Sequence, residues 1–165
     1  MILLTRTEYE LSACDEMTNV AVGINTFLKE EAERYAENGL DISFTEKASL
    51  QIRCTRENFL RILENVADNS LKYKRGERGT LAIALSQSET ETLLTFSDNG
   101  TGVPENDLPH IFEPFYRADK SRTKSSAHNG IGLAVVKRVV AAAGGEIYAY
   151  NNKTGGLSVF IAFKK

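Results

Sequence analysis

The sequence predicts an α+β domain in which helices cover one face of a largely antiparallel sheet. Two segments in the first half carry apolar residues at helical spacing. Short runs with alternating apolar residues follow them, a pattern typical of strands with one buried face. The chain has 165 residues, of which 42% are hydrophobic, and is therefore long enough to form one globular domain with its own core.

The composition argues against several classes of protein. A formal net charge of −2 gives no global electrostatic reason to expect nucleic acid or an anionic membrane as a partner. The richest apolar segment, GIGLAVVKRVVAAAGG, is interrupted by Lys137 and Arg138, so we expect no membrane span and a soluble, cytosolic domain. Cys14 and Cys54 lack the spacing of a metal site and are expected to be reduced thiols.

The first half of the chain is expected to form a helix, two strands and a second helix. The first helix spans residues 18–38, and Gly39 closes it in a left-handed conformation. The runs LDISF and SLQIRC are short strands. Thr55 caps the second helix, which continues to Tyr73. Its buried face is expected to comprise Phe59, Ile62, Leu63, Val66 and Ser70.

The second half is expected to add four strands and one helix. The runs TLAIALSQ and ETLLTFS form a hairpin, and the second run leads directly to Asp98. Residues 113–129 are too poor in apolar side chains to pack as a regular element. A third helix spans residues 130–143, and the strands EIYAY and LSVFIAF follow it.

The stretch FSDNGTGVP places a carboxylate immediately after a strand and then two glycines one residue apart. Glycine enters positive φ at low cost and lets a ligand approach the backbone, so Gly100 and Gly102 suit either a tight turn or a bound molecule. A surface turn capped by Asp98 and Asn99 is the simpler interpretation. Motifs elsewhere in the sequence must decide between a surface turn and a ligand site.

A polar stripe on the second helix is the first such clue. Asn65 and Asn69 lie within about 40° of each other around the helix axis, and Lys72 and Tyr73 continue the same side. Solvated polar faces are common, but asparagine is a poor helix former for that purpose. Its carbonyl oxygen suits Mg²⁺, whose remaining ligands are waters and nucleotide phosphates.

A second clue is the segment HNGIGLAVVKRVV, in which Gly130 and Gly132 stand at the start of the third helix. The free N–H groups and dipole of a helix start attract anions, and glycine lets phosphate oxygens come close. The segment is not a P-loop, because no Gly-Lys-Ser/Thr follows. A Gly-x-Gly pair is weak evidence by itself, and its order after the other motifs strengthens it.

Together these motifs resemble the ATP-binding catalytic domain of sensor histidine kinases, in the superfamily of gyrase, mismatch-repair ATPases and heat-shock chaperones. NVADNSLKY resembles the asparagine box, DNGTG the first glycine box, IFEPFYRAD the phenylalanine box and NGIGL the second glycine box. The resemblance covers residues 17–165. It implies a two-layer sandwich, the Bergerat ATP-binding fold, with a mixed, mostly antiparallel sheet of about five strands packed on three helices.

The resemblance also implies roles for individual residues. Asp98 would read the adenine amine, and Asn69 with Asn65 would hold Mg²⁺. Phe112 and Phe115 would pack at the root of a lid over the nucleotide, spanning residues 113–129. The lid cations would be Arg117 and, as weaker candidates that could equally be solubilising, Lys120, Arg122 and Lys124. Asn65 and Arg117 would act in catalysis, and the ATP contacts would be Asn69, Lys72, Tyr73, Asp98, Gly100, Gly102, Val103, Gly130, Gly132 and Leu133.

Sensor kinases transfer the γ-phosphoryl group to a histidine on a dimerisation hairpin, from which a response regulator receives it. The two histidines here, His110 and His128, fall in the phenylalanine box and the lid, where no acceptor is expected. We therefore expect residues 1–16 to be a linker or the tail of that hairpin. The expected setting is the cytoplasmic part of a membrane-anchored sensor, with no nucleic acid and no direct membrane contact.

Three other functions remain open at this point. An anti-sigma-type protein-serine kinase is the runner-up, because its smaller, unfused architecture would explain the absent hairpin. A clamp-type ATPase would couple hydrolysis to a conformational cycle, and a nucleotide-binding adaptor would not catalyse at all. The ending KRVVAAAGGEIYAYNNKTGG favours the sensor kinase, because it resembles the end of those domains.

We predict that the domain binds ATP but hydrolyses it only marginally. Clamp ATPases carry a glutamate one helical turn before the metal-binding asparagine, whereas this chain has Asn65, an amide that cannot act as a base. A general base contributes about 10² to 10⁴-fold, and Glu64 lies about 140° around the helix from Asn69. Steady-state phosphate release from wild type, Glu64→Ala and Asn69→Ala tests this. Rapid turnover that depends on Glu64 would support the ATPase instead.

Overall fold

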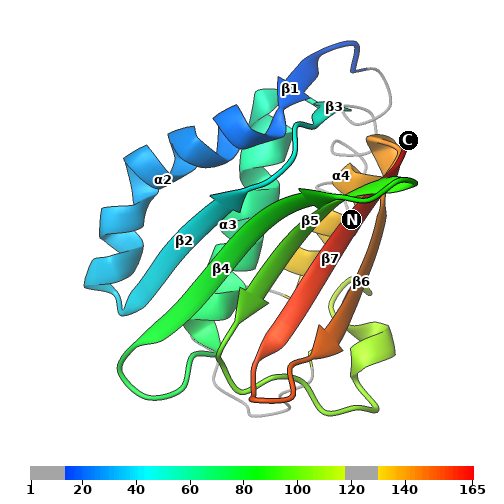
Figure 1. The fold of residues 1–165 in the computed structure, drawn as a ribbon. Coiled ribbons are helices and arrows are strands. Elements are labelled where there is room, and N and C mark those ends of the chain that lie inside the picture. The colour runs from blue at the N-terminus through cyan, green and yellow to red at the C-terminus, as the bar shows by residue number, and fades with distance from the viewer. Residues whose placement is uncertain (1–13, 118–129) are drawn as a thin grey trace.

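A computed structural model describes residues 14–117 and 130–165 of the chain. Five strands form one sheet, and three helices lie on one side of it (Figure 1). Among the residues that the structure describes, no α-helix covers the other face of the sheet. The predicted two-layer α+β sandwich is confirmed.

The elements follow the predicted order, with two short additions. The structure adds a three-residue strand before the first helix and a 3₁₀ turn after the fifth strand. In chain order the elements are β1 (Met17–Asn19), α2 (Val20–Glu37), β2 (Leu40–Glu46), β3 (Gln51–Arg53), α3 (Arg56–Lys72), β4 (Gly79–Gln87), β5 (Glu91–Asp98), η1 (Leu108–His110), α4 (Gly132–Ala142), β6 (Glu146–Asn151) and β7 (Leu157–Lys164).

The main sheet has the strand order β2-β4-β5-β7-β6. β2 and β4 are parallel, which agrees with the helix that connects them, and the other three pairs are antiparallel. β4 and β5 form the predicted hairpin, in which Leu81 pairs with Asp98. β3 does not join this sheet and pairs instead with β1.

Two helix starts lie later in the chain than the sequence suggested. Thr18 was expected in the first helix but lies in β1, where it pairs with Ile52 and its hydroxyl donates to the carbonyl of Cys54 at 2.7 Å. α2 begins at Val20, because the Asn19 side chain caps it. α4 begins at Gly132 rather than at residue 130, and the chain is still in a left-handed turn at residue 130.

The helices and the sheet enclose one hydrophobic core. Tyr35 on α2 is fully buried, and its hydroxyl donates to Asp68 on α3 at 2.7 Å. Desolvation, with Asp68 as the second cause, raises the pKa of Tyr35. α2 and α3 also approach closely at Gly23, where a Cβ would stand 2.6 Å from two carbons of the Phe59 ring.

The most apolar segment of the sequence forms α4 and packs inside the domain. Val136, Val139 and Val140 are buried, while Lys137 is exposed. In the described ranges no helix is both long and apolar enough to cross a membrane. Cys54 is a free thiol that is 4% exposed, and burial raises its pKa to about 11.

We predict that Gly23→Ala destabilises the domain although alanine favours helices. Alanine gains about 1 kcal/mol in helix propensity over glycine, but its methyl group would overlap the buried Phe59 ring. Overpacking a core costs about 1 to 3 kcal/mol, so we expect a lower free energy of unfolding in urea. Val22→Ala, on the exposed side of the same helix, serves as the control. A more stable Gly23→Ala variant would contradict the contact.

Candidate functional site

A cavity of about 600 Å³ opens between the helix layer and the loop that follows β5, and its size suits a small-molecule ligand. It brings together residues from α3, β5, the loop after β5, the start of α4 and the start of β7. The lining residues are Asn65, Asn69, Lys72, Tyr73, Asp98, Thr101, Gly102, Val103, Pro104, Ile111, Tyr116, Arg117, Gly130, Gly132, Leu133 and Leu157.

Eleven of the twelve candidate site residues from the sequence line this cavity, and Gly100 does not. Gly100 lies behind the wall, where a Cβ would stand 2.5 Å from the carbonyl oxygen of Tyr73. The next residue, Thr101, donates its N–H to that same oxygen at 2.9 Å. Gly100 therefore allows the end of α3 to touch the loop after β5, and its contact with a ligand stays a prediction.

Asp98 is the last residue of β5, and its carboxylate is fixed by donors from three segments. Its Oδ1 accepts the backbone N–H of Gly100 at 2.9 Å and that of Leu157 at 3.0 Å. Its Oδ2 accepts the hydroxyl of Ser70 at 3.2 Å. The acid is thus a preorganised acceptor on the cavity wall.

The turn between β6 and β7 packs directly against Asp98. Asn152 donates its side-chain amide to the carbonyl of Asp98 at 2.9 Å, and it accepts the hydroxyl of Ser158 at 2.6 Å. Gly156 has φ +97°, and a Cβ there would stand 2.1 Å from the Asp98 carbonyl oxygen. Only glycine allows this approach, so the turn is shaped to hold Asp98.

Asn151, at the end of β6, holds the loop that carries the second glycine. Its Oδ1 accepts the N–H of Val103 at 2.9 Å, and its Nδ2 donates to the Val103 carbonyl at 2.6 Å. Gly102 has φ +71°, and a Cβ there would stand 2.8 Å from Asn151 Oδ1. The loop is therefore clamped to the sheet while Gly102 and Val103 line the cavity.

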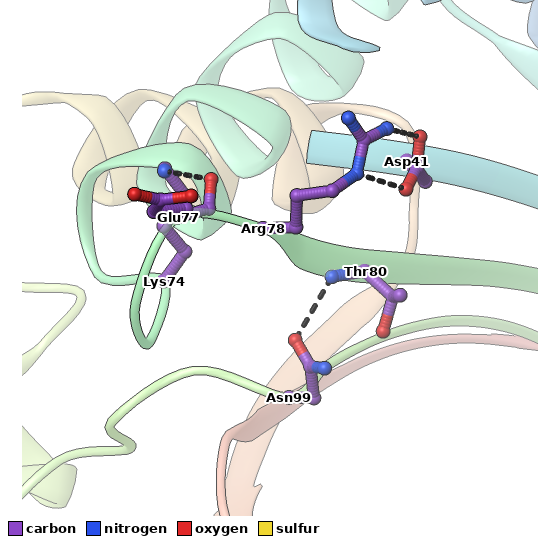
Figure 2. Close-up of polar contacts among 6 residues, drawn as sticks. All are labelled: Asp41, Lys74, Glu77, Arg78, Thr80 and Asn99. Atoms are coloured by element: carbon purple, nitrogen blue, oxygen red, sulfur yellow. Dashed lines mark hydrogen bonds and ion pairs between the residues drawn. The ribbon is translucent and has the colours of Figure 1, made fainter. Parts of the chain in front are cut away.

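The loop between α3 and β4 is held by polar contacts within itself and with β2 (Figure 2). Lys74 donates to the carbonyl of Glu77 at 2.6 Å and so folds the loop on itself. Arg78 forms a two-pronged ion pair with Asp41 on β2, with Arg78 Nη2 2.6 Å from Asp41 Oδ1. Asn99 accepts the N–H of Thr80 at 2.8 Å, which ties the residue after Asp98 to β4.

α3 presents two amide side chains to the cavity. Asn65 donates its Nδ2 to the carbonyl of Arg61 at 2.7 Å, which leaves its Oδ1 as the acceptor that faces α4. A Cβ at Gly132 would stand 2.9 Å from that Oδ1. Two amide oxygens beside a helix start form a donor set that suits a hard cation bound together with phosphates, so Asn65 and Asn69 fit Mg²⁺. In the described ranges, no cluster of three or more His, Cys, Asp or Glu side chains offers an alternative metal site.

The start of α4 has the features of an anion site. Gly130, Gly132 and Leu133 line the cavity, and neither a capping side chain nor an acidic residue stands in the first turn of the helix. Gly130 has φ +70° and accepts the N–H of Phe115 at 3.0 Å. Lys72 and Arg117 add positive charge to the same cavity, so its field favours a polyanionic ligand.

Tyr116 also lines the cavity. Its hydroxyl donates to Asp107, and this hydrogen bond is the main cause that raises the pKa of Tyr116. His110 lies outside the cavity lining, with its ring 5.2 Å from the Tyr116 ring and its Nδ1 2.9 Å from Glu113 Oε1. Tyr116 is therefore held as a neutral donor beside the cavity.

The expectation for the two phenylalanines of the lid root is half right. Phe112 packs against the core, as predicted. Phe115 does not, because its φ of +63° turns the side chain outward and leaves it 61% exposed. The other lid cations, Lys120, Arg122 and Lys124, lie outside the described residues.

The sequence did not point to several residues of the site. Ser70 was assigned to the buried face of α3 from its helical spacing, and it is buried there, but its hydroxyl also donates to Asp98. Its position directly after Asn69 was the available signal. Asn151 and Asn152 act through contacts between segments that are far apart in the chain, and the sequence pattern alone carried no sign of these contacts. Thr101, Pro104, Ile111, Tyr116 and Leu157 complete the lining that was not predicted.

Residues 54–165 match the family of histidine kinase-, DNA gyrase B- and HSP90-like ATPases, and the chain belongs to this family. The fold and the motifs place it in the histidine kinase class of ATP-binding catalytic domains. Membership of this family implies that the domain binds ATP.

Two relatives with similar sequences are sensor kinases. It is 34% identical over 129 residues to the signal transduction histidine-protein kinase BaeS of Escherichia coli K12, covering 78% of this chain and 27% of BaeS. It is 31% identical over 170 aligned positions to the sensor protein kinase WalK of Staphylococcus saprophyticus, covering 98% of this chain and 28% of WalK. The chain thus spans little more than a quarter of the length of these relatives.

Solved structures agree with the fold. The mycobacterial sensor histidine kinase MprB superposes with a TM-score of 0.76 at 24% identity, over 90% of this chain and 97% of that chain. Histidine kinase ThkA in complex with the response regulator TrrA gives a TM-score of 0.70 at 19% identity, over 91% of this chain and 41% of that chain. At these identities the likeness establishes the fold alone.

We predict that Asp98→Asn loses most of the affinity for ATP and that GTP competes poorly with ATP on the wild type. An asparagine whose Oδ1 keeps both backbone N–H groups would present an NH₂ where the carboxylate accepts. In Asp98→Asn the adenine amine would face another donor, and in the wild type the guanine carbonyl would face the Asp98 carboxylate. Each case leaves buried polar groups unpaired, which costs about 1 to 3 kcal/mol of binding free energy.

Competition against a fluorescent ATP analogue measures both effects. Asp41→Asn is the matched control, because Asp41 is an exposed carboxylate that pairs with Arg78 and does not line the cavity. Undiminished binding by Asp98→Asn, or equal competition by GTP and ATP, would contradict the role of Asp98 as the reader of the base.

Proposed function

We propose that this domain binds Mg·ATP and donates the γ-phosphoryl group to a histidine on a helical dimerisation hairpin. The observation that carries the proposal is the pairing, within one cavity, of a fixed carboxylate at the end of β5 with an uncapped helix start at α4. The carboxylate suits a base that offers an amine. The helix start suits a phosphate chain.

At the base end, Asp98 accepts a hydrogen bond from the exocyclic amine of adenine. Gly102 and Val103 let the ring approach, because Asn151 holds their backbone against the sheet. Tyr73 and Lys72 flank the nucleoside and the phosphates, with the Lys72 ammonium 5.0 Å from the centre of the Tyr73 ring. Binding at this end orients the nucleotide and excludes water from the base.

At the phosphate end, the backbone of Gly130, Gly132 and Leu133 binds phosphate oxygens. Asn69 and Asn65 would hold Mg²⁺, which supplies charge neutralisation across the phosphates when it is bound. Asn65 also contacts the transferring group, and Arg117 neutralises its charge. Neither Asn65 nor Arg117 can deprotonate a nucleophile at neutral pH, so the acceptor must bring its own lone pair.

A neutral imidazole meets that requirement. Its ring nitrogen attacks the γ-phosphorus, the bond to the β,γ-bridging oxygen breaks, ADP leaves, and the imidazole loses its remaining proton to water. His110 is unsuited as the acceptor, because it lies outside the cavity lining and pairs with Glu113. We assign residues 17–165 to the catalytic domain and residues 1–16 to a linker or the tail of the hairpin.

The relatives support this setting. BaeS and WalK are named as signal transduction and sensor kinases, and a solved ThkA complex contains a response regulator. We infer that phosphate passes from the hairpin histidine to a response regulator, and that the domain is the cytoplasmic part of a membrane-anchored sensor. An ATPase cycle is less favoured, because Glu64 is exposed and does not line the cavity.

We predict that ATP alone leaves no acid-labile phosphate on this chain, because the acceptor histidine is expected on the hairpin and, among the described residues, His110 does not line the cavity. Adding a separately produced histidine-bearing hairpin from the same kinase should yield labelled hairpin when γ-labelled ATP is present. His110→Gln and His128→Gln should transfer as the wild type does, whereas Asp98→Asn should not. Label on His110 or His128 of the isolated chain would overturn the assignment of the acceptor.

A further inference from the structure

Ser70 is a buried hydroxyl for which neither the family motifs nor the cavity lining suggests a role. It lies on α3 one residue after Asn69, and 2% of its surface is exposed. Its hydroxyl donates to Asp98 Oδ2 at 3.2 Å. Ser70 does not line the cavity, so any effect it has on a ligand must act through Asp98.

The hydrogen bonds of Asp98 leave little freedom for a further partner. A carboxylate offers about four lone-pair positions, two on each oxygen. The backbone N–H groups of Gly100 and Leu157 occupy both positions on Oδ1. Ser70 occupies one position on Oδ2, and one position remains.

We propose that Ser70 is a positioning residue that makes this site selective for 6-aminopurine nucleotides. By occupying one side of Oδ2, the hydroxyl directs the last open lone pair of Asp98 toward one N–H of the base amine. Without the hydroxyl, Oδ2 would have two open positions, and water would compete with the amine for both. The proposal rests on the proposed role of Asp98 as the reader of adenine.

A purely structural role for Ser70 is the alternative, and it makes a different prediction. If the hydroxyl only ties α3 to β5, its removal loosens the whole cavity and weakens every nucleotide alike. If it directs Asp98, its removal weakens only nucleotides that carry the amine. Comparing ATP with purine riboside 5′-triphosphate, which lacks the 6-amino group, separates the two.

The affinities of both nucleotides are measured by competition against a fluorescent ATP analogue, for wild type and Ser70→Ala. The wild type should prefer ATP over the amine-free analogue by about tenfold or more. Ser70→Ala should lower this preference by about five- to tenfold through weaker ATP binding, with the affinity for the analogue unchanged. Ser70→Cys keeps the size and a weak donor, so its preference should lie between the two.

Thr18→Ala is the matched control, because it also removes a buried hydroxyl. The Thr18 hydroxyl donates to the carbonyl of Cys54, which precedes the N-terminus of α3, whereas Ser70 lies near the C-terminus of that helix. It should keep the wild-type preference, and thermal unfolding of each variant checks the fold. An unchanged preference in Ser70→Ala, or equal losses for both nucleotides, would overturn the proposal. If Ser70→Ala does not fold, a full wild-type preference in Ser70→Cys would overturn it. A wild type that binds both nucleotides equally would instead remove the role of Asp98 in reading the base.

Discussion

The structure of the site depends on one constraint: a single carboxylate is held by backbone groups from a loop and a strand that lie far apart in the chain. Gly100 belongs to the loop after β5 and Leu157 to the start of β7, and both donate to Asp98 Oδ1. Because each N–H has a fixed place in its own segment, this loop, the start of β7 and the end of β5 must move together. The cavity wall is therefore as rigid as the sheet, and the Asp98 carboxylate is already in position before a ligand binds.

The opposite wall is built differently, because helix packing rather than strand pairing positions it. α3 is anchored to α2 by the hydrogen bond between Tyr35 and Asp68 and by the close contact at Gly23. Its end is joined to the sheet-borne wall where Thr101 donates to the Tyr73 carbonyl. The amides of Asn65 and Asn69 on α3 therefore lie at a fixed distance from the carboxylate of Asp98. Such a fixed distance is what a site needs if it is to bind the two ends of one elongated ligand.

Local patterns in the sequence were enough to predict most of the fold. The six predicted strands and three helices rest on alternation, helical spacing and caps, all of which are properties of neighbouring residues. β1 was missed because three residues carry no measurable period, and because its partner β3 lies more than thirty positions away along the chain. The contact of Gly100 with the Tyr73 carbonyl was not predicted, because a glycine in a sequence indicates a close approach without indicating which group approaches. Ser70 was correctly placed on the buried face of α3, but its contact with Asp98 was not predicted, because burial gives a short polar side chain the same periodicity as an apolar one.

The place of β7 in the sheet has a consequence for how the chain folds as it is synthesised. β7 is the last strand in the sequence, yet it lies between β5 and β6, and Glu91 pairs with Lys164. Until β7 has left the ribosome, β5 has an unpaired edge and Asp98 lacks its partner Leu157. An open edge of this kind is a template for pairing with other chains. Nucleotide binding cannot protect the nascent domain from such pairing, because the binding site is complete only after β7 has paired with β5.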